Sequence, residues 1–418
     1  MFHKILLPLI SLLQLSYALT LQEAIELTLN ANHSIKEQEY LLKEMQYSYQ
    51  KNQSPFYPSI NVNYTTNQSN HLNQRGKKSS GSFGSDIQYN LFNGLSDIFT
   101  LSSSYTLYQA QEHQLQSIKE DIILQVKTAY INVLRQSQNV LIAEQSKALL
   151  EEQRRENAEF YKVGLIPKND LLKVEVELKN ATQTLLSAKS DLAYFTKTLE
   201  HYTRININPK ELIELKLHKP KFNPNALQNL MYQKRSELLY LDKVIQSKDY
   251  LIKSNKGNFL PDIDLIGKYT NYGDNYRLIG KNGTYKEETS LELQVNLNLF
   301  NGFKDKYLLE SSKINKLAFQ SQRITLIENL DLQLFKSLEV YNLALNAYEI
   351  SLVALQQAEE NYRISQNRYK ARIESTSNFL DAELLLTKAR SNVILNRYGI
   401  IQAIAEIERI TQTPQVQE

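Results

Sequence analysis

The residues that most often carry chemistry are sparse in this chain of 418 residues and stand apart from one another. Cysteine is absent, which excludes disulfides, thiolate metal sites and a lipid-modified N-terminal Cys. No two histidines have the spacing of metal ligands, and the sequence contains neither a phosphate-binding loop nor a nucleophile elbow. The six histidines are His3, His33, His71, His113, His201 and His218. We therefore expect no catalytic residue, no metal and no cofactor, and a protein that is not an enzyme.

The most informative pattern is the tetrapeptide Leu-Phe-Asn-Gly, which occurs at 91–94 and again at 299–302. Asn93 and Asn301 are 208 residues apart, and the same spacing relates Tyr161 to Tyr369. In both copies the tetrapeptide joins a strand-like segment to a very long helix-like segment. A shared period indicates one supersecondary unit used twice: strand, strand, long helix, turn, long helix. The residues at the two predicted strand–helix junctions are Asn93, Gly94, Asn301 and Gly302.

Hydrophobic periodicity places strands and helices within each copy. Apolar and polar residues alternate over 60–65, 83–91 and 263–269, and most regularly from Leu291 to Leu299, as expected for strands. Gly and Pro are absent between Leu95 and Val163 and between Phe303 and Tyr398, so each span can hold a helix of about sixty residues or more. A further helix is predicted from Leu21 to Ser54, before Pro55.

Apolar residues of both long segments recur in steps of three and four, which predicts lateral packing of helices through a heptad seam. Taken alone, this seam would fit a generic coiled coil. The seam residues are Leu115, Ile118, Ile122, Val126, Ala129, Val133 and Val140 in the first copy, and Ile327, Leu330, Leu334, Leu338, Tyr341, Leu345, Tyr348, Leu352 and Leu355 in the second.

The N-terminus, Met1 to Ala18, combines a basic start, an apolar run and a small-x-small ending, which is typical of a secretory signal peptide. We therefore predict a signal peptide at 1–18 and a first repeat at 19–208 with a helix, a strand pair and a long helical hairpin. The second repeat, at 209–418, would begin with an equatorial segment and continue with a helix, a strand pair and a long helical hairpin. The formal net charge is only +3, with basic and acidic residues interspersed, so nucleic acid is not expected as a partner.

The predicted strands have one apolar and one polar face and are about ten residues long, the length that a tilted strand needs to cross a bilayer. Four strands are too few for a sandwich with its own core, and a sheet within a membrane cannot leave its edges unpaired. We therefore expect the chain to share strands with copies of itself. Three copies would supply twelve strands, an even number within the range of closed antiparallel barrels.

With these features, the chain resembles the TolC family of outer-membrane efflux and secretion channels over Leu19 to Thr413. The most specific segments are the strand entries 56–60 (Phe-Tyr-Pro-Ser-Ile) and 259–263 (Phe-Leu-Pro-Asp-Ile), both Leu-Phe-Asn-Gly motifs, and the turn 161–165 (Tyr-Lys-Val-Gly-Leu). The resemblance implies a mainly α fold with a small antiparallel β part. Long α-helical hairpins of three protomers would form an α-barrel through the periplasm, continued by a shared 12-stranded transmembrane β-barrel with four strands per protomer.

The resemblance also implies a function and partners. The chain would be the outer-membrane channel of a tripartite efflux pump or of a type I secretion system, a passive conduit in contact with outer-membrane lipid. Its partners would be two further copies, a periplasmic adaptor (membrane fusion protein) and an inner-membrane transporter. The hairpin-tip residues Val163, Gly164, Leu165 and Arg372 would dock the adaptor.

A pore constriction and gate near the second hairpin turn are likewise implied by the resemblance. Tyr369 corresponds to the Tyr that holds the gate closed, Asp170 with Asn169 to its first-copy partner, and Asn378 and Asp381 to the acidic rings. Two positions depart from the family pattern: Asn378 replaces an acid, and Glu374 stands where other members carry a gate-locking Arg. A closed state that is secured differently or less firmly is therefore expected.

Four alternatives remain open from the residues. Asp381 could be a solvated acid near a helix N-terminus, where the macrodipole favours it, and Tyr369 could be a packing residue. The whole chain could be a non-channel coiled-coil structural protein of the envelope, although such a protein would not need the strand at 291–299. A periplasmic adaptor would need one helical hairpin and a compact β domain, not two equal hairpins with strand pairs.

Overall fold

The computed structural model describes residues 18–72, 76–278 and 286–413, so the predicted signal peptide lies outside the described residues apart from Ala18. Short 3-10 turns are formed by η1 (Ser54–Phe56) and η2 (Pro209–Glu211). The helices are α1 (Leu21–Ala31), α2 (His33–Lys51), α3 (Ser96–Lys162), α4 (Lys168–Thr203), α5 (Pro224–Lys234), α6 (Ser236–Gly257), α7 (Lys304–Lys370) and α8 (Thr376–Thr411), and the strands are β1 (Ser59–Gln68), β2 (Ser79–Asn93), β3 (Asp262–Gly273) and β4 (Glu287–Asn296).

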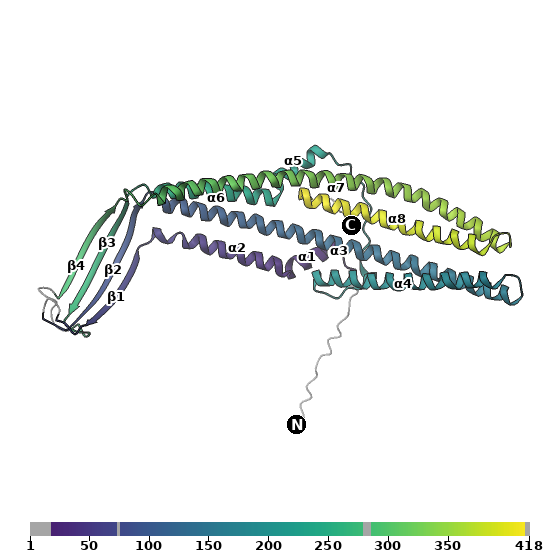
Figure 1. Ribbon diagram of the computed structural model, residues 1–418, viewed down its shortest axis with the longest axis horizontal. Helices are drawn as coiled ribbons and strands as arrows, with labels where there is room; N and C mark the ends of the chain where they lie inside the picture. The colour runs from purple at the N-terminus through teal and green to yellow at the C-terminus, as the bar shows by residue number, and fades with distance from the viewer. Residues whose placement is uncertain (1–17, 73–75, 279–285, 414–418) are drawn as a thin grey trace, which may run out of the picture. The chain divides into compact units, whose positions relative to one another are not determined.

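The two predicted hairpins have equal lengths, as expected from the repeat. Helices α3 and α7 each contain 67 residues, and α4 and α8 each contain 36 (Figure 1). Every bound of α7 and α8 falls 208 residues after the matching bound of α3 and α4. At 1.5 Å per residue, α3 and α7 are each about 100 Å long. No helix in the described part of the chain combines the length and the apolar composition that crossing a membrane requires.

The first helical segment differs from the prediction, because it is broken at Asn32. The backbone N–H of Asn32 donates to the carbonyl of Thr28, which ends α1. Its side-chain Oδ1 accepts the N–H groups of Ser34 at 2.8 Å and Ile35 at 3.3 Å, as the N-cap of a new helix does. The prediction of one continuous helix from Leu21 to Ser54 is therefore wrong, and α2 ends at Lys51.

The described strands form one antiparallel sheet in the order β1-β2-β3-β4. The strand pair of each repeat has the same register, with Ser59 opposite Gln88 in the first and Asp262 opposite Asn296 in the second. A bulge in β2 between Asn90 and Phe92 shifts the pairing with β3. Strand β4 begins earlier and ends earlier than the alternation from Leu291 to Leu299 predicts.

The pairing register places apolar and polar side chains on opposite faces of the sheet. Hydrogen bonds and an ion pair join the polar face across strands: Asn61 donates to Asp86 at 2.9 Å, Asn90 donates to Asp262 at 2.6 Å, and Lys268 lies 3.8 Å from Glu292. On the apolar face the side chains are largely exposed, Leu291 at 78%. This face includes Ile60, Val62, Tyr64, Phe83, Ile87, Ile263, Leu265, Leu291, Leu293 and Val295. The sheet therefore presents an open apolar surface.

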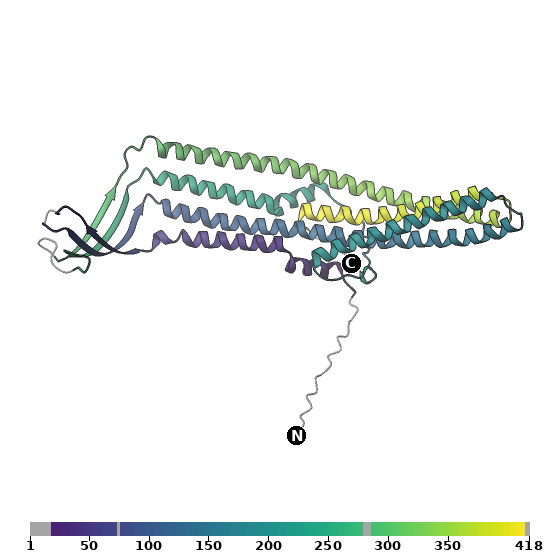
Figure 2. The same ribbon diagram turned by 60° about the horizontal axis from the view of Figure 1, so that its bottom comes forward.

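The chain divides into two compact units, and each takes segments from both repeats. The unit formed by 36–117 and 236–328 contains the sheet and a layer of helices in the order α2-α3-α6-α7 (Figure 2). Gln111 donates to Gln38 at 3.0 Å, Ser103 and Ser247 share a hydrogen bond of 2.8 Å, and Arg323 pairs with Asp242 at 2.5 Å. The helices therefore follow the order of the strands to which they are connected.

The other unit contains residues 18–35, 118–235 and 329–413, which include α4, α8 and the parts of α3 and α7 that lead to the two hairpin turns. The segment 209–223 is fixed to its helices by two buried tyrosines. Tyr130 donates to the carbonyls of Leu19 and Ile213, both at 2.8 Å, and Tyr398 donates to Glu214 at 2.7 Å. Burial, with the Glu214 hydrogen bond, raises the pKa of the Tyr398 phenol. This segment is thus an integral part of the unit.

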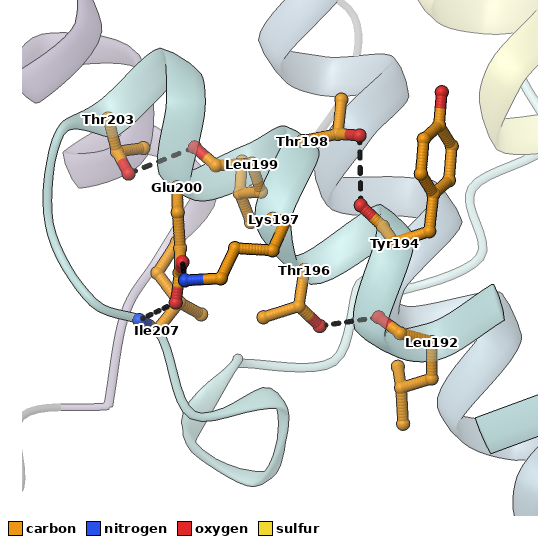
Figure 3. Close-up of polar contacts among 9 residues, drawn as sticks. All are labelled: Leu192, Tyr194, Thr196, Lys197, Thr198, Leu199, Glu200, Thr203 and Ile207. Carbon is orange, nitrogen blue, oxygen red and sulfur yellow. Dashed lines mark hydrogen bonds and ion pairs between the residues drawn. The ribbon is translucent and has the colours of Figure 1, made fainter. Parts of the chain in front are cut away.

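The end of α4 is closed by a carboxylate that binds the following loop (Figure 3). Arg204 has a left-handed φ of 62° and ends the helix. One oxygen of Glu200 accepts the N–H of Ile207 at 3.0 Å, and the other binds Lys197 at 2.5 Å. The hydrogen bonds from Lys197 and from the Ile207 backbone hold the pKa of Glu200 below its usual range. Glu200 therefore ties the loop back onto the helix that precedes it.

Candidate functional site at the hairpin tips

The turns that join α3 to α4 and α7 to α8 have the same backbone structure. In the first, the N–H of Leu165 donates to the carbonyl of Phe160 at 2.8 Å, and Gly164 has a φ of +76°. In the second, the N–H of Ile373 donates to the carbonyl of Arg368 at 2.9 Å, and Arg372 has a φ of 65°. Both are Schellman endings, in which a left-handed residue follows the helix. The second copy thus places Arg where a residue without a Cβ is favoured.

A cation–π contact explains why Arg372 is accommodated in the left-handed conformation. Its guanidinium carbon lies 3.4 Å from the centroid of the Phe160 ring, on the other hairpin. Such a contact contributes about 0.5 to 2 kcal/mol, comparable with the cost of a left-handed L-residue. Around it, Val163, Leu165 and Ile373 are each more than 60% exposed. The two tips therefore expose apolar side chains, and Arg372 joins the second tip to the first.

Behind the tips, Tyr369 is buried and bonded to the first hairpin. Its phenol donates to Oδ1 of Asn157 at 2.5 Å, and the same oxygen accepts from Gln153 at 3.1 Å. The Tyr369 ring stacks on Phe379 with centroids 5.0 Å apart. Asn157 is fully buried, and its Nδ2 has no partner in the described residues. Tyr369 therefore links α7 to α3 through a polar contact inside a packed region.

The expected pairing of Tyr369 with Asp170 is not found in the described residues. Asp170 lies in the first turn of α4 and its carboxylate is 3.5 Å from the ammonium of Lys173. The residue that contacts Tyr369 is instead Asn157, 212 residues before it, in the helix that precedes the turn. The sequence offered only a weak signal for this contact, because Asn157 is one of several polar residues on α3.

Glu374 and Asn378 are bonded within their own hairpin. Glu374 pairs with Arg368 at 3.2 Å and accepts a hydrogen bond from the Asn378 side chain at 2.6 Å. Ser375 is the N-cap of α8 and accepts the backbone N–H of Asn378 at 3.2 Å. Glu374 therefore stabilises the second turn itself and makes no bond to the first hairpin within the described residues.

Asp381 lies one turn further along α8, is exposed, and has no hydrogen bond or ion pair in the described part of the chain. It lines a groove of about 440 Å³ between α4 and α8, together with Asn169, Lys173, Glu177 and Ser377. The apolar floor between the hairpins is formed by Leu150, Val174 and Leu380. Asp381 and Asn169 thus share one groove, whereas Asp170 is not among its lining residues.

Glu383 is a buried residue that also lines this groove. Its Oε1 accepts hydrogen bonds from Ser146 at 2.7 Å and from Thr387 at 2.9 Å. Burial, with the nearby charge of Glu383, raises the pKa of the Tyr362 phenol. Glu383 thus joins α8 to α3 and does not act as a free surface charge.

The predicted strand–helix junctions differ in their surroundings. Asn93 accepts the N–H of Asp97 at 3.4 Å, and Asn301 donates to the Asp305 carboxylate. Gly94 and Gly302 both have a φ of +69°, which favours glycine. A Cβ on Gly94 would collide with the backbone of Gly257, whereas a Cβ on Gly302 would meet nothing within 4 Å. The close backbone contact between Gly94 and Gly257 in the first copy therefore has no counterpart at Gly302 in the second.

No group of three or more His, Cys, Asp or Glu side chains in the described ranges is placed to hold a metal ion.

Comparisons with known proteins agree on one family and one fold. The chain matches the family described as outer membrane efflux protein over residues 24–203 and 229–411. It is 22% identical over 312 residues to the outer membrane protein TolC of Vibrio cholerae, covering 71% of this chain and 70% of that protein.

Solved structures show the same fold at low sequence identity. A membrane protein of Pseudomonas aeruginosa superposes with a TM-score of 0.82 at 14% identity, covering 94% of this chain and 92% of that one. The CmeC outer membrane channel of Campylobacter jejuni superposes with a TM-score of 0.79 at 16% identity, covering 94% of this chain and 85% of that one. The mainly α fold with a small antiparallel sheet is thereby confirmed.

Proposed function

This chain belongs to the outer membrane efflux protein family, and on that premise we propose that it forms a homotrimer that binds a periplasmic adaptor and an inner-membrane transporter. The chain is an outer-membrane channel component, extends into the periplasm and is not an enzyme. Channels of this family are trimeric and work with efflux pumps. The partners and the site residues of this chain are our proposal.

The proposal rests on the arrangement of the two repeats, which lie side by side in one sheet and leave its two edge strands unpaired in the described residues. Within one unit, β2 pairs with β3 and α3 packs on α6, which joins the first repeat to the second. In the described residues, β1 at one end and β4 at the other pair with no further strand. Unpaired edges are costly in hydrocarbon, so β4 of one copy is expected to pair with β1 of the next.

Three copies joined in this way give twelve strands and a closed β-barrel, with the helix layer α2-α3-α6-α7 continued as a closed α-barrel. The exposed apolar face of the sheet, with Leu291 and Leu293, is then the face in contact with lipid. The polar face, with Asp86 and Gln294, lines the lumen. A coiled-coil structural protein would require neither the sheet nor its apolar face, and an adaptor would require only one hairpin.

The hairpin tips support the proposed contact with an adaptor. Val163, Leu165 and Ile373 expose apolar side chains at the two hairpin turns, and Arg372 contacts the Phe160 ring across them. The core of a protein-binding surface is more apolar than its rim, and Arg is enriched in such surfaces. We propose that Val163, Gly164, Leu165 and Arg372 bind the adaptor, and that this surface contains six tips in the trimer.

The pore constriction is proposed at Asp381 and Asn378, because both are exposed at the start of α8 and only Asn378 is bonded to a neighbour. Tyr369 with Asn157, Arg372 with Phe160, and Glu383 with Ser146 hold the second hairpin against the first. We propose that these contacts secure the closed state in place of the missing Arg at 374. Asp170, which pairs with Lys173, and Asn169, which shares the groove with Asp381, are the proposed gate residues of the first hairpin.

Single-channel recordings test this assignment of the constriction. Three carboxylates near a symmetry axis attract cations by their summed field. Asp381→Asn should therefore reduce cation selectivity and block by multivalent cations, and Asn378→Asp should increase both. Glu383→Gln should change selectivity less, because Glu383 is buried and bonded. An unchanged selectivity in Asp381→Asn would show that other side chains form the constriction.

A further inference from the structure

Lys173 is the repeat counterpart of Asp381, since the two residues are 208 positions apart. The second turn of the shorter helix of each hairpin therefore carries a cation in the first copy (α4) and an anion in the second (α8). The Lys173 ammonium donates to Oγ of Ser377 at 2.8 Å, on the first turn of α8, and lies 3.5 Å from Asp170. Lys173 thus reaches from the first hairpin to the second.

The position of the ammonium brings it to the same face of α8 as Asp381. Ser377 and Asp381 are four residues apart on this helix, so their side chains are neighbours one turn apart. Lys173 and Asp381 also line the same groove between α4 and α8. The Lys173 side chain is about half exposed, at 47%, and its four-carbon stem can move between the two α8 residues.

Electrostatics favours Asp381 as the second partner of this cation. The ammonium lies near the N-terminus of α8, where the helix macrodipole repels positive charge. Asp170 and Ser377 offset this repulsion at the observed position. Asp381 is exposed and has no hydrogen bond or ion pair in the described residues. Two further carboxylates line the groove: Glu177 lies one turn beyond Lys173 on α4, and Glu383 is buried and bonded to Ser146 and Thr387. Asp381 therefore has an available counter-ion on its own protomer.

We propose that Lys173 determines the ion selectivity of this channel by acting as the counter-ion of Asp381. This inference rests on the proposed function, in which Asp381 faces the constriction. Each protomer then contributes a paired cation and anion at this level, and the field of a pair falls off faster than the field of a single carboxylate. The three carboxylates are partly compensated, and the channel selects cations less strongly than Asp381 alone would make it.

The test is a double-mutant cycle on full-length trimers in planar bilayers. Lys173→Gln keeps a donor for Ser377 and removes the charge. We expect the cation-to-anion permeability ratio, from reversal potentials in a salt gradient, to rise at least about twofold, with half-block by La³⁺ at a lower concentration. In the Asp381→Asn background the same substitution should have much less effect. Lys179→Gln, an exposed Lys of α4 that lines a different groove, is the matched control.

The outcomes separate the inference from the proposed function. If Asp381→Asn lowers selectivity but Lys173→Gln leaves it unchanged, the constriction stands and the counter-ion role is wrong. Fully additive effects of the two substitutions would also overturn the pairing, because they describe independent charges. If neither substitution alters selectivity, the assignment of Asp381 to the constriction fails, and the inference fails with it. Trimers that resist heat in electrophoresis confirm that each variant is folded.

Discussion

Tyr369 shows how a single buried polar contact can connect two hairpins. Its hydroxyl donates to Asn157, which is fully buried and also bonded to Gln153. A buried acceptor that loses one donor carries a desolvation cost, so the contact contributes to stability although its net free energy is small. The repeat counterpart Tyr161 is 42% exposed. The two tyrosines therefore differ in burial although they are equivalent in the duplication.

Tyr369→Phe should lower the free energy of unfolding by about 1 kcal/mol, because it removes the hydroxyl and keeps the ring that stacks on Phe379. Thermal unfolding in detergent measures the effect. Tyr161→Phe is the control and should leave stability within about 0.5 kcal/mol. If the gate proposal is correct, Tyr369→Phe should also raise the frequency of open events. Equal stabilities of the two variants would show that the hydrogen bond to Asn157 contributes nothing.

At the scale of the element, the strands provide a test of membrane orientation. Leu291 lies in the middle of β4 on the apolar face, whereas Val295 is next to the end of the strand. Leu291→Arg should therefore cost about 2 to 4 kcal/mol, and Val295→Arg about 1 kcal/mol or less, because the penalty falls toward the interface. Ser290→Arg, on the polar face, is the control. Yield of heat-resistant trimers reports the effect, and similar yields for Leu291→Arg and Ser290→Arg would contradict the orientation.

The end of α4 provides a pH-dependent test. Hydrogen bonds from Lys197 and the Ile207 N–H hold the pKa of Glu200 below its usual value. A lowered folded pKa means that the carboxylate stabilises the fold above the unfolded pKa of about 4.3, and that this contribution is lost as pH falls through the folded value. Hydrogen exchange at Ile207 should therefore accelerate on acidification of the wild type.

Glu200→Ala should already show this faster exchange at pH 7 and should respond less to acid. Lys197→Ala is the matched control, because the bond from Ile207 to Glu200 remains. Protection of the Ile207 amide that does not depend on Glu200 would show that the loop is held by other contacts.

How far the sequence predicts the elements depends on whether local patterns or distant contacts determine them. The repeat spacing predicts both long hairpins, because α3 and α7 have no Gly or Pro and end in the same turn chemistry. The break at Asn32 was missed, although the apolar stripe changes there from Leu21, Ile25 and Leu29 to Leu41 and Met45. That change of stripe was the available signal.

The candidate site was less predictable, because side-chain partners depend on how helices cross. Asp381, Asn378 and Glu374 lie near one turn, so their sequence positions place them together. The partners Asn157 and Ser146 lie on α3, more than two hundred residues earlier, and no local pattern indicates them. Lys173 could have been found, because it is related to Asp381 by the spacing of the repeat.

At the scale of the whole molecule, the duplication predicts how copies assemble. Corresponding residues of the strand pairs are 203 positions apart in β1 and β3, and 208 apart in β2 and β4, with the same pairing register. The pairing of β2 with β3 places Asp86 opposite Lys268. Strand β4 is the repeat counterpart of β2, and β1 is the counterpart of β3. If β4 of one copy pairs with β1 of the next in the register of β2 with β3, the counterpart of Asp86, Gln294, lies opposite the counterpart of Lys268, Thr65.

Disulfide cross-linking of this pair tests the central claim most directly, and the absence of cysteine from the natural chain makes the experiment clean. Directly opposed residues have Cα atoms about 4.5 to 5.5 Å apart, within disulfide range. The double variant Thr65→Cys and Gln294→Cys should give a covalent trimer in the outer membrane on oxidation. Asn61→Cys with Gln294→Cys, shifted by four residues, should not. A Thr65–Gln294 variant that remains monomeric after oxidation would contradict the closed ring of three chains.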